Sequence, residues 1–165
     1  MPKAKSSKPA QSPAKEPARP QLWFVFQDGA QVYGVSPAMV AEVAGHSVMA
    51  PVPLSPVWLD GVVCIRGVVL PVLNLASFFG LEPKSHGSRL VLLGPQAERF
   101  AVWSDKVHGL VQVQQDQLEA PLSTLPDALR RCCEGQFRMG NRDVLVLNAP
   151  RLLDQSREPA SPQET

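Results

Sequence analysis

The sequence predicts an all-β fold, built as one β-barrel or as a pair of β-barrels. Short runs of valine, leucine and aromatic residues recur along the chain, and their length and composition favour strands over helices. Glycine and proline lie between these runs, and only brief segments have a helical pattern. Many short strands joined by such turns are typical of β-barrels.

The clearest element is an apolar β-hairpin, whose two strands are predicted at residues 62–65 and 68–73. The turn between them is Arg66-Gly67, where Gly67 can supply the positive φ that a tight turn needs. Pro71 lies inside the second run. Because proline has no N–H to donate to a ladder, it favours an edge strand or a bulge there.

Arg66 is the only charged side chain of this hairpin and is expected at its tip. A lone arginine is rarely buried without a partner, so it should be exposed or matched to a carboxylate. Two interpretations stay open, because Arg66 could simply keep the turn soluble or could recognise a partner protein. The same choice holds for Glu42, which lies between apolar residues and could belong to a solvated face.

The N-terminal part of the fold is predicted as a second hairpin. Residues 22–26 and 31–35 should pair across the Asp28-Gly29 turn. Ser36-Pro37 has the pattern of an N-cap followed by proline at the first helical position. A short helix should therefore precede a strand at residues 40–43.

The middle of the chain begins with residues 50–60, an extended connector that contains three prolines. Residues 76–79 predict one helical turn, with Gly80 as its C-cap. Three further strands are predicted, at residues 90–93, 100–103 and 107–113.

The last third contains an irregular segment and a short amphipathic helix. The helix is predicted at residues 125–133, with Leu125, Leu129 and the two adjacent cysteines on one face. A final hairpin should join residues 136–139 to 144–147, and the fold should end over residues 151–154.

One domain, residues 21–154, is expected between two tails. Residues 1–20 form a tail rich in proline, alanine and lysine with nothing apolar to bury, and residues 155–165 are polar and should be flexible. No apolar run is long enough to span a bilayer, and the first 20 residues lack the apolar segment of a secretory signal. The expected location is therefore the cytoplasm, with no insertion into a membrane.

The charge distribution argues against a nucleic-acid partner. The chain has 16 lysines and arginines and 15 aspartates and glutamates, and five of the basic residues but only one acidic residue lie in residues 1–20. The remainder, with 11 basic and 14 acidic residues, is mildly acidic, whereas a nucleic-acid-binding body should have a basic face. A small nucleic-acid-binding β-barrel remains the alternative from a different class, and a continuous basic stripe would favour it.

The motifs of common enzymes are absent from the sequence, which predicts a non-catalytic protein without a cofactor or metal. It contains no G-x-S-x-G, glycine-rich phosphate loop or H-E-x-x-H. The three histidines are far apart and lack ligand spacing. Cys64, Cys132 and Cys133 do not form a disulfide framework and are expected to be reduced thiols.

A family resemblance appears in the apolar hairpin and extends in register along residues 22–154. The spacing of Gly61, Arg66-Gly67, Pro71 and Asn74 resembles the characteristic segment of CheW-like domains, the coupling adaptors of bacterial chemotaxis. The sequence departs from the family pattern at Trp103, where smaller aliphatic residues are common. Further matching positions are Tyr33-Gly34-Val35, residues 40–43, Phe78-Phe79-Gly80, Val102, Asp105, Val107, residues 144–148 and Leu152-Leu153.

The resemblance implies two small five-stranded SH3-like β-barrels packed through an apolar seam. It also implies a role in coupling the cytoplasmic tip of a methyl-accepting chemoreceptor to the regulatory domain of the histidine kinase CheA, at membrane-associated receptor arrays. An auxiliary scaffold of a non-flagellar chemosensory pathway fits the resemblance as well. The implied site residues are Arg66, Glu42 and Val43 for the receptor, Gly61 and Val40 for the kinase, and Gly67, Pro71 and Asn74 for the structural motif.

Overall fold

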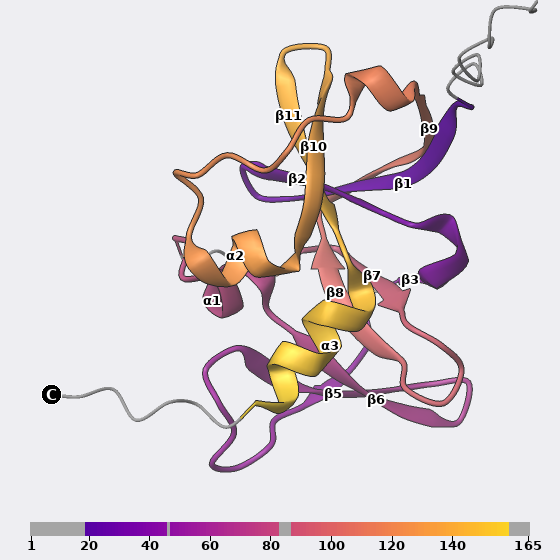
Figure 1. Cartoon of the computed structure of the whole chain (residues 1–165). Helices are drawn as coiled ribbons and strands as arrows, with labels where there is room; N and C mark the ends of the chain where they lie inside the picture. Colours follow the sequence, from indigo (N-terminus) through magenta and orange to yellow (C-terminus); the bar gives the residue numbers. More distant parts are fainter. Residues whose placement is uncertain (1–18, 46, 83–86, 159–165) are drawn as a thin grey trace, which may run out of the picture.

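Two β-sheets make up most of the fold (Figure 1). The computed structural model describes residues 19–45, 47–82 and 87–158, and the expected tails lie largely outside this range. The first sheet has five strands in the order β10-β11-β2-β1-β9. Its strands are β1 (Gln21–Asp28), β2 (Gln31–Val35), β9 (Lys106–Val113), β10 (Cys133–Met139) and β11 (Arg142–Leu147).

The second sheet has six strands in the order β3-β7-β8-β6-β5-β4. The prediction of two packed β subdomains is confirmed, although this sheet has one more strand than expected. The additional strand, β4, lies at the start of the predicted connector and pairs with β5. The strands are β3 (Val40–Gly45), β4 (Met49–Ala50), β5 (Leu59–Ile65), β6 (Val68–Leu73), β7 (Arg89–Leu93) and β8 (Phe100–Ser104).

Pro71 does not lie in an edge strand, because β6 is flanked by β8 and β5. The edge alternative predicted from this proline is therefore wrong for the strand as a whole. The ladder between β6 and β8 begins only at Val72, however, so Pro71 pairs with Val62 of β5 and with no residue of β8. A proline is tolerated at such a position because its missing N–H interrupts no ladder bond.

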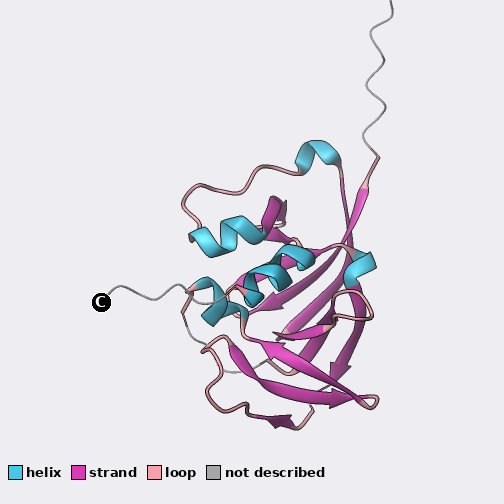
Figure 2. Cartoon of the chain, turned by 60° about the horizontal axis from the view of Figure 1, so that its bottom comes forward, coloured by secondary structure: helices cyan, strands magenta, loops and turns pink. Residues whose placement is uncertain are grey.

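The described residues form three short α-helices, which gather beside the sheets (Figure 2). Gly80 has a φ of 69° and caps α1 in the left-handed conformation, as predicted. Ser36 precedes η1, but its side chain makes no capping hydrogen bond, so that part of the prediction is wrong. The helical segments are η1 (Pro37–Met39), α1 (Leu75–Phe79), η2 (Gln115–Gln117), α2 (Asp127–Cys132) and α3 (Ala149–Arg157), and α3 continues beyond the expected end of the fold.

The largest apolar core lies between the two sheets and joins them. It combines buried side chains of the first sheet, such as Phe26 and Tyr33, with buried side chains of the second, such as Phe100 and Val102. The three α-helices contribute to the same core, and each sheet also has a smaller core on its other face. The apolar seam implied by the resemblance is thus present.

The segment β5–β6–α1 is repeated later in the chain as β10–β11–α3. The two first strands have seven residues each and the two second strands have six. Both hairpins close on a two-residue turn, Arg66-Gly67 in one and Gly140-Asn141 in the other, and both have a bulge next to their first residue. Positions in the two hairpins therefore correspond one to one.

Asparagines in equivalent positions support this repeat. Asn74 and Asn148 each follow the second strand, and each side chain accepts a hydrogen bond from the backbone N–H three residues later, at 3.1 and 3.0 Å. Each amide also donates to a carboxylate 14 residues earlier, that of Asp60 for Asn74 and that of Glu134 for Asn148. Both asparagines act as helix N-caps, which explains why asparagine is suited to these positions.

The remaining strands are also equivalent between the two halves of the chain. Each half contributes strands to both sheets, so the halves are intertwined. β1 pairs with β9, whereas β7 pairs with β3, and both ladders have a bulge at the corresponding place. β2 runs parallel to β11, whereas β8 runs parallel to β6. Each sheet therefore contains a hairpin from one half of the chain and strands from the other half.

Candidate partner-binding surfaces

The structure brings Arg66 and Glu42 together. Arg66 and Gly67 have φ angles of 52° and 80°, the two positive values that a type I′ turn requires. Arg66 Nε lies 3.3 Å from Glu42 Oε2, and the two side chains are 81% and 29% exposed. So exposed an ion pair contributes little to stability, so the bridge does not explain why these residues are present.

The Arg66–Glu42 pair borders a groove of about 210 Å³. Buried side chains of the second sheet, Leu70 and Leu92, lie at its base. Arg99 also lines this groove, although no motif in the sequence points to it. Together these groups offer apolar surface bordered by charge, which suits a protein partner. The groove is lined by Glu42, Ile65, Arg66, Val68, Leu70, Leu92, Gln96 and Arg99.

The repeat provides an internal comparison for this groove. The position of Arg66 corresponds to Gly140, because both begin the turn of equivalent hairpins. The position of Glu42 corresponds to Gly109, because each follows the bulge of its ladder and pairs with the same position of the neighbouring strand, Leu92 and Val25 respectively. The first sheet forms with glycine at both positions, so the fold itself does not require the arginine or the glutamate.

Val40 and Val43 are half-buried and pack against the central core. Glu42 lies between them and reaches Arg66 instead. Three strands separate Val40 from Gly61 in the order of the second sheet, so the structure does not place the two kinase-binding candidates next to each other along it. Of the receptor-binding candidates, it brings Glu42 and Arg66 into contact.

Gly61 is buried, and its own chain approaches it closely. A Cβ at this position would overlap the carbonyl oxygen of Ala50 in β4 and would lie 2.8 Å from Met49 Cγ. The need for glycine here is therefore explained by the β4–β5 contact. Any effect of Gly61 on a partner would be transmitted through the position of β4.

The outward face of β4, β5 and β6 is apolar, and we call it the apolar face. Alternation along the paired strands places Ala50, Val62, Cys64, Val69 and Pro71 on it. Cys64 is exposed and Val69 is 64% exposed. Further exposed apolar side chains flank these strands, namely Val48, Leu54 and Val57.

The equivalent exposed positions of the first sheet are charged. Cys64 corresponds to Arg138 and Val69 to Asp143, and both charged residues are exposed and paired across β10 and β11. The fold therefore accepts charges at these positions. An exposed apolar surface that the fold does not need marks an interaction site.

The family model for the CheW-like domain matches residues 23–157. The chain belongs to the CheW-like family. It is 34% identical to protein FrzA of Myxococcus xanthus over 87% of this chain and 92% of that protein. It is 25% identical to a probable chemotaxis protein CheW of Rhizobium etli, over 84% and 90% of the two chains. These relatives place the chain among the adaptor proteins of chemosensory signalling.

The fold agrees with a solved CheW-like structure, the scaffolding protein TtCheW of Thermoanaerobacter tengcongensis. The TM-score is 0.68 at 21% identity, and the match covers 79% of this chain and 90% of that one. None of the helices in the described part of the chain is long and apolar enough to cross a membrane.

Trp103 departs from the CheW-like pattern, and the structure shows what holds it. The side chain is 3% exposed, and its Nε1–H donates to Asp60 Oδ2 at 2.8 Å. Asp60 also accepts a hydrogen bond from the N-cap residue Asn74. The tryptophan thus connects β8 to the start of β5 and to α1.

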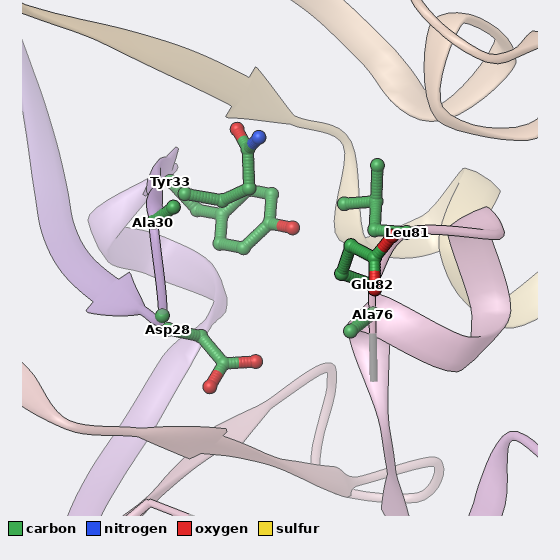
Figure 3. A pocket seen from close by; sticks show the side chains of 8 residues that line it. Asp28, Ala30, Tyr33, Ala76, Leu81 and Glu82 are labelled. Carbon is green, nitrogen blue, oxygen red and sulfur yellow. The ribbon is translucent and has the colours of Figure 1, made fainter. Parts of the chain in front are cut away.

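A cavity of about 350 Å³ lies between the β1–β2 hairpin and the end of α1 of this CheW-like domain. Figure 3 shows the Tyr33 hydroxyl directed across it toward Leu81, with the Asp28 carboxylate at one side. Burial and, to a smaller extent, Asp28 raise the pKa of Tyr33, so the phenol remains a hydrogen-bond donor. Glu82 also lines the cavity.

The cysteines of the CheW-like domain are free thiols, as predicted. Cys64 is exposed, whereas Cys132 and Cys133 are buried and have raised pKa values because of that burial. Buried, protonated thiols are poor nucleophiles. Among the described residues, no group of three or more histidine, cysteine, aspartate or glutamate side chains could hold a metal ion.

Proposed function

We propose that this CheW-like protein is a non-catalytic adaptor that couples the cytoplasmic tip of a chemoreceptor to the regulatory domain of the histidine kinase CheA. It would act at receptor arrays by binding both partners, without turnover of its own. The groove at Arg66 and Glu42 binds the receptor, and the apolar face binds the kinase. The two surfaces belong to the same hairpin, β5–β6, so they can communicate through it.

The conformation of Arg66 is the observation that supports the receptor groove best. Arginine takes a φ of 52° here, where the equivalent turn has glycine. A left-handed conformation costs a residue with a Cβ about 1–2 kcal/mol. This cost, and the weak ion pair, indicate that the side chain is retained for recognition. Its planar guanidinium offers five donors, suited to oxygen atoms on a receptor helix.

The apolar face supports the kinase-binding role. The core of a stable protein interface is apolar and has few charges. The apolar face has this character, and Gly61 lies beneath it, where β4 and β5 meet. This explains how a substitution of Gly61 could affect kinase binding although Gly61 is buried. Val40 packs against the central core and does not lie on the apolar face, so its part in kinase binding would be indirect.

A titration of two variants against both partners tests the assignment. In the first variant, Arg66→Gly installs the residue of the equivalent turn. In the second, Cys64→Arg with Val69→Asp installs the charged pair that the first sheet already accepts. We expect the first variant to lose affinity for a receptor tip fragment and the second to lose affinity for the kinase regulatory domain.

Each variant is the control for the other, because both partners are titrated against both proteins. Melting curves verify that neither variant has lost its fold. Equal losses for both partners in either variant, or a loss for neither, would contradict the separation of the two surfaces.

A further inference from the structure

Arg99 immediately precedes β8 and lines the receptor groove together with Glu42 and Arg66. Its Nε atom is buried and has no hydrogen-bond partner. Within the described part of the chain, no hydrogen bond or ion pair involves the Arg99 side chain. A buried donor without an acceptor is unfavourable, so this arginine needs an explanation.

The repeat shows that the fold does not require a charge at this position. Phe100 pairs with Leu93 as Tyr33 pairs with Phe26, so the residue before each, Arg99 and Val32, is equivalent. Val32 is 1% exposed and belongs to the core of the first sheet. The same position in the second sheet therefore carries an arginine where an apolar side chain would satisfy the fold.

The charges of the groove are unbalanced. Two arginines, Arg66 and Arg99, and one carboxylate, that of Glu42, line the groove, and Glu42 already contacts Arg66. The volume of about 210 Å³ has room for a side chain from a partner, and the base of the groove is apolar. Arg99 is partly exposed and its Nε is buried, so a carboxylate that reaches this donor meets little competition from water.

We propose that Arg99 binds a glutamate or aspartate side chain that a receptor helix inserts into this groove. This proposal rests on the proposed function, because it takes the receptor tip as the occupant. Arg66 at the rim would orient the helix, and Arg99 would decide which helices fit by requiring an acidic residue at one position. A helix without that residue would leave the buried Nε of Arg99 unpaired, so it would be rejected.

The test uses Arg99→Val, which installs the residue that the equivalent position already has, and Arg99→Gln, which removes only the charge. Arg138→Gln removes an exposed charge from the other sheet and serves as the matched control. The probe is a two-helix fragment of a chemoreceptor tip, prepared in its native sequence and with each glutamate and aspartate changed singly to its amide. Titrations with this series and with the kinase regulatory domain give the affinities.

We expect both Arg99 variants to bind the native receptor fragment about tenfold more weakly or worse, the range for a charge-assisted hydrogen bond. Kinase affinity should be unchanged, and the melting temperature of Arg99→Val should equal or exceed that of the native protein. One amide-substituted fragment should bind the native protein as weakly as it binds Arg99→Val. The residue changed in that fragment is then the acidic partner of Arg99.

Unchanged receptor affinity in Arg99→Val would overturn the proposal, as would a lowered melting temperature with parallel losses for receptor and kinase. The absence of any fragment whose substitution is coupled to Arg99 would overturn it as well. The Arg66→Gly variant distinguishes a failure of the Arg99 proposal from a failure of the proposed receptor site. If Arg66→Gly weakens receptor binding and Arg99→Val does not, only the role of Arg99 fails; if neither does, the groove is not the receptor site.

Discussion

Arg66 and Gly140 occupy the same position in the two equivalent hairpins, with φ angles of 52° and 62°, although only the Arg66 turn continues with a second positive φ, at Gly67. A positive φ suits glycine and strains a residue with a Cβ, so Arg66 is strained at this position and Gly140 is not. Unlike glycine, arginine has a long side chain, and at this position it reaches Glu42 and lines the groove. The strain is thus a property of one repeat and is connected with a surface that the other repeat lacks.

Arg66→Gly should separate stability from recognition. We expect the free energy of unfolding to stay within about 1 kcal/mol of the native value, because relief of strain offsets the loss of a weak ion pair. Receptor affinity should fall by about 1–3 kcal/mol. Chemical denaturation and a titration with a receptor fragment measure the two quantities. The control is Gly140→Ala, which should lower stability and leave receptor affinity unchanged.

Gly61→Ala should displace β4, because the added Cβ overlaps the Ala50 carbonyl oxygen. We expect a loss of at least about 1 kcal/mol of stability, as for other substitutions that force a local backbone shift. Kinase affinity should fall with it, since β4 belongs to the apolar face. Gly45→Ala is the control, because no atom lies within 4 Å of a Cβ placed there. Native stability in Gly61→Ala would show that the β4–β5 contact is not close.

A maleimide should modify Cys64 alone in the folded protein, since Cys132 and Cys133 are buried. Mass spectrometry of the native and the denatured protein should show one and three adducts. The modification places a bulky group on the apolar face, so kinase binding should be lost while receptor binding is kept. Cys64→Ala, treated with the same reagent, controls for modification elsewhere. Intact kinase binding after complete labelling of Cys64 would remove the apolar face from the kinase site.

Stability should fall above pH 9. Burial raises the pKa of Cys132 from 9.0 to about 12 and also raises the pKa of Cys133. The folded protein then holds these protons more firmly than the unfolded chain does, so their contribution is complete below pH 9 and is lost as the pH approaches 12. Urea midpoints measured between pH 8 and pH 11 should decrease. Cys132→Ala should show a shallower decrease, and an identical slope would exclude this thiol as a cause.

Trp103→Phe should keep most of the buried apolar surface and remove the hydrogen bond to Asp60. The expected loss is about 1–3 kcal/mol, because Asp60 is left with one partner fewer at a half-buried position. Thermal denaturation measures this loss. Addition of Asp60→Asn should recover part of it, since the amide needs less compensation than the charge. If the stability changes caused by Trp103→Phe and Asp60→Asn were fully additive in the double variant, the two residues would not interact.

The central hairpin could be predicted from sequence because its cause is local. The valine-rich runs on either side of Gly67, and the asparagine after the second run, act over a few residues. Strand β4 was not predicted, because Met49–Ala50 has no pattern of its own and pairs only where β5 presents an edge. The edge-strand prediction from Pro71 is wrong for a related reason, since the residue at which the neighbouring strand β8 begins to pair is not a local property.

The candidate site was predicted only in part. Arg66 is predictable because it is the one charge between the two predicted strands of the apolar hairpin, and the family resemblance implies Glu42. Arg99 follows Gln96 and Glu98 in a polar segment, so nothing in the sequence distinguishes it from a solvated charge. Its importance appears only when β7 and β8 bring it beside the hairpin. The equivalence of Arg99 and Val32 likewise requires the register of both sheets.

The reciprocal exchange of strands has a consequence for how this protein is made. A ribosome releases β1 to β6 first, and none of these strands can complete its sheet until the second half has emerged. During this interval β2 lacks β11 and β6 lacks β8, so their edges are open to other chains. Two nascent copies could therefore trade halves and form an intertwined dimer, and this hazard would rise with the local concentration of translating ribosomes.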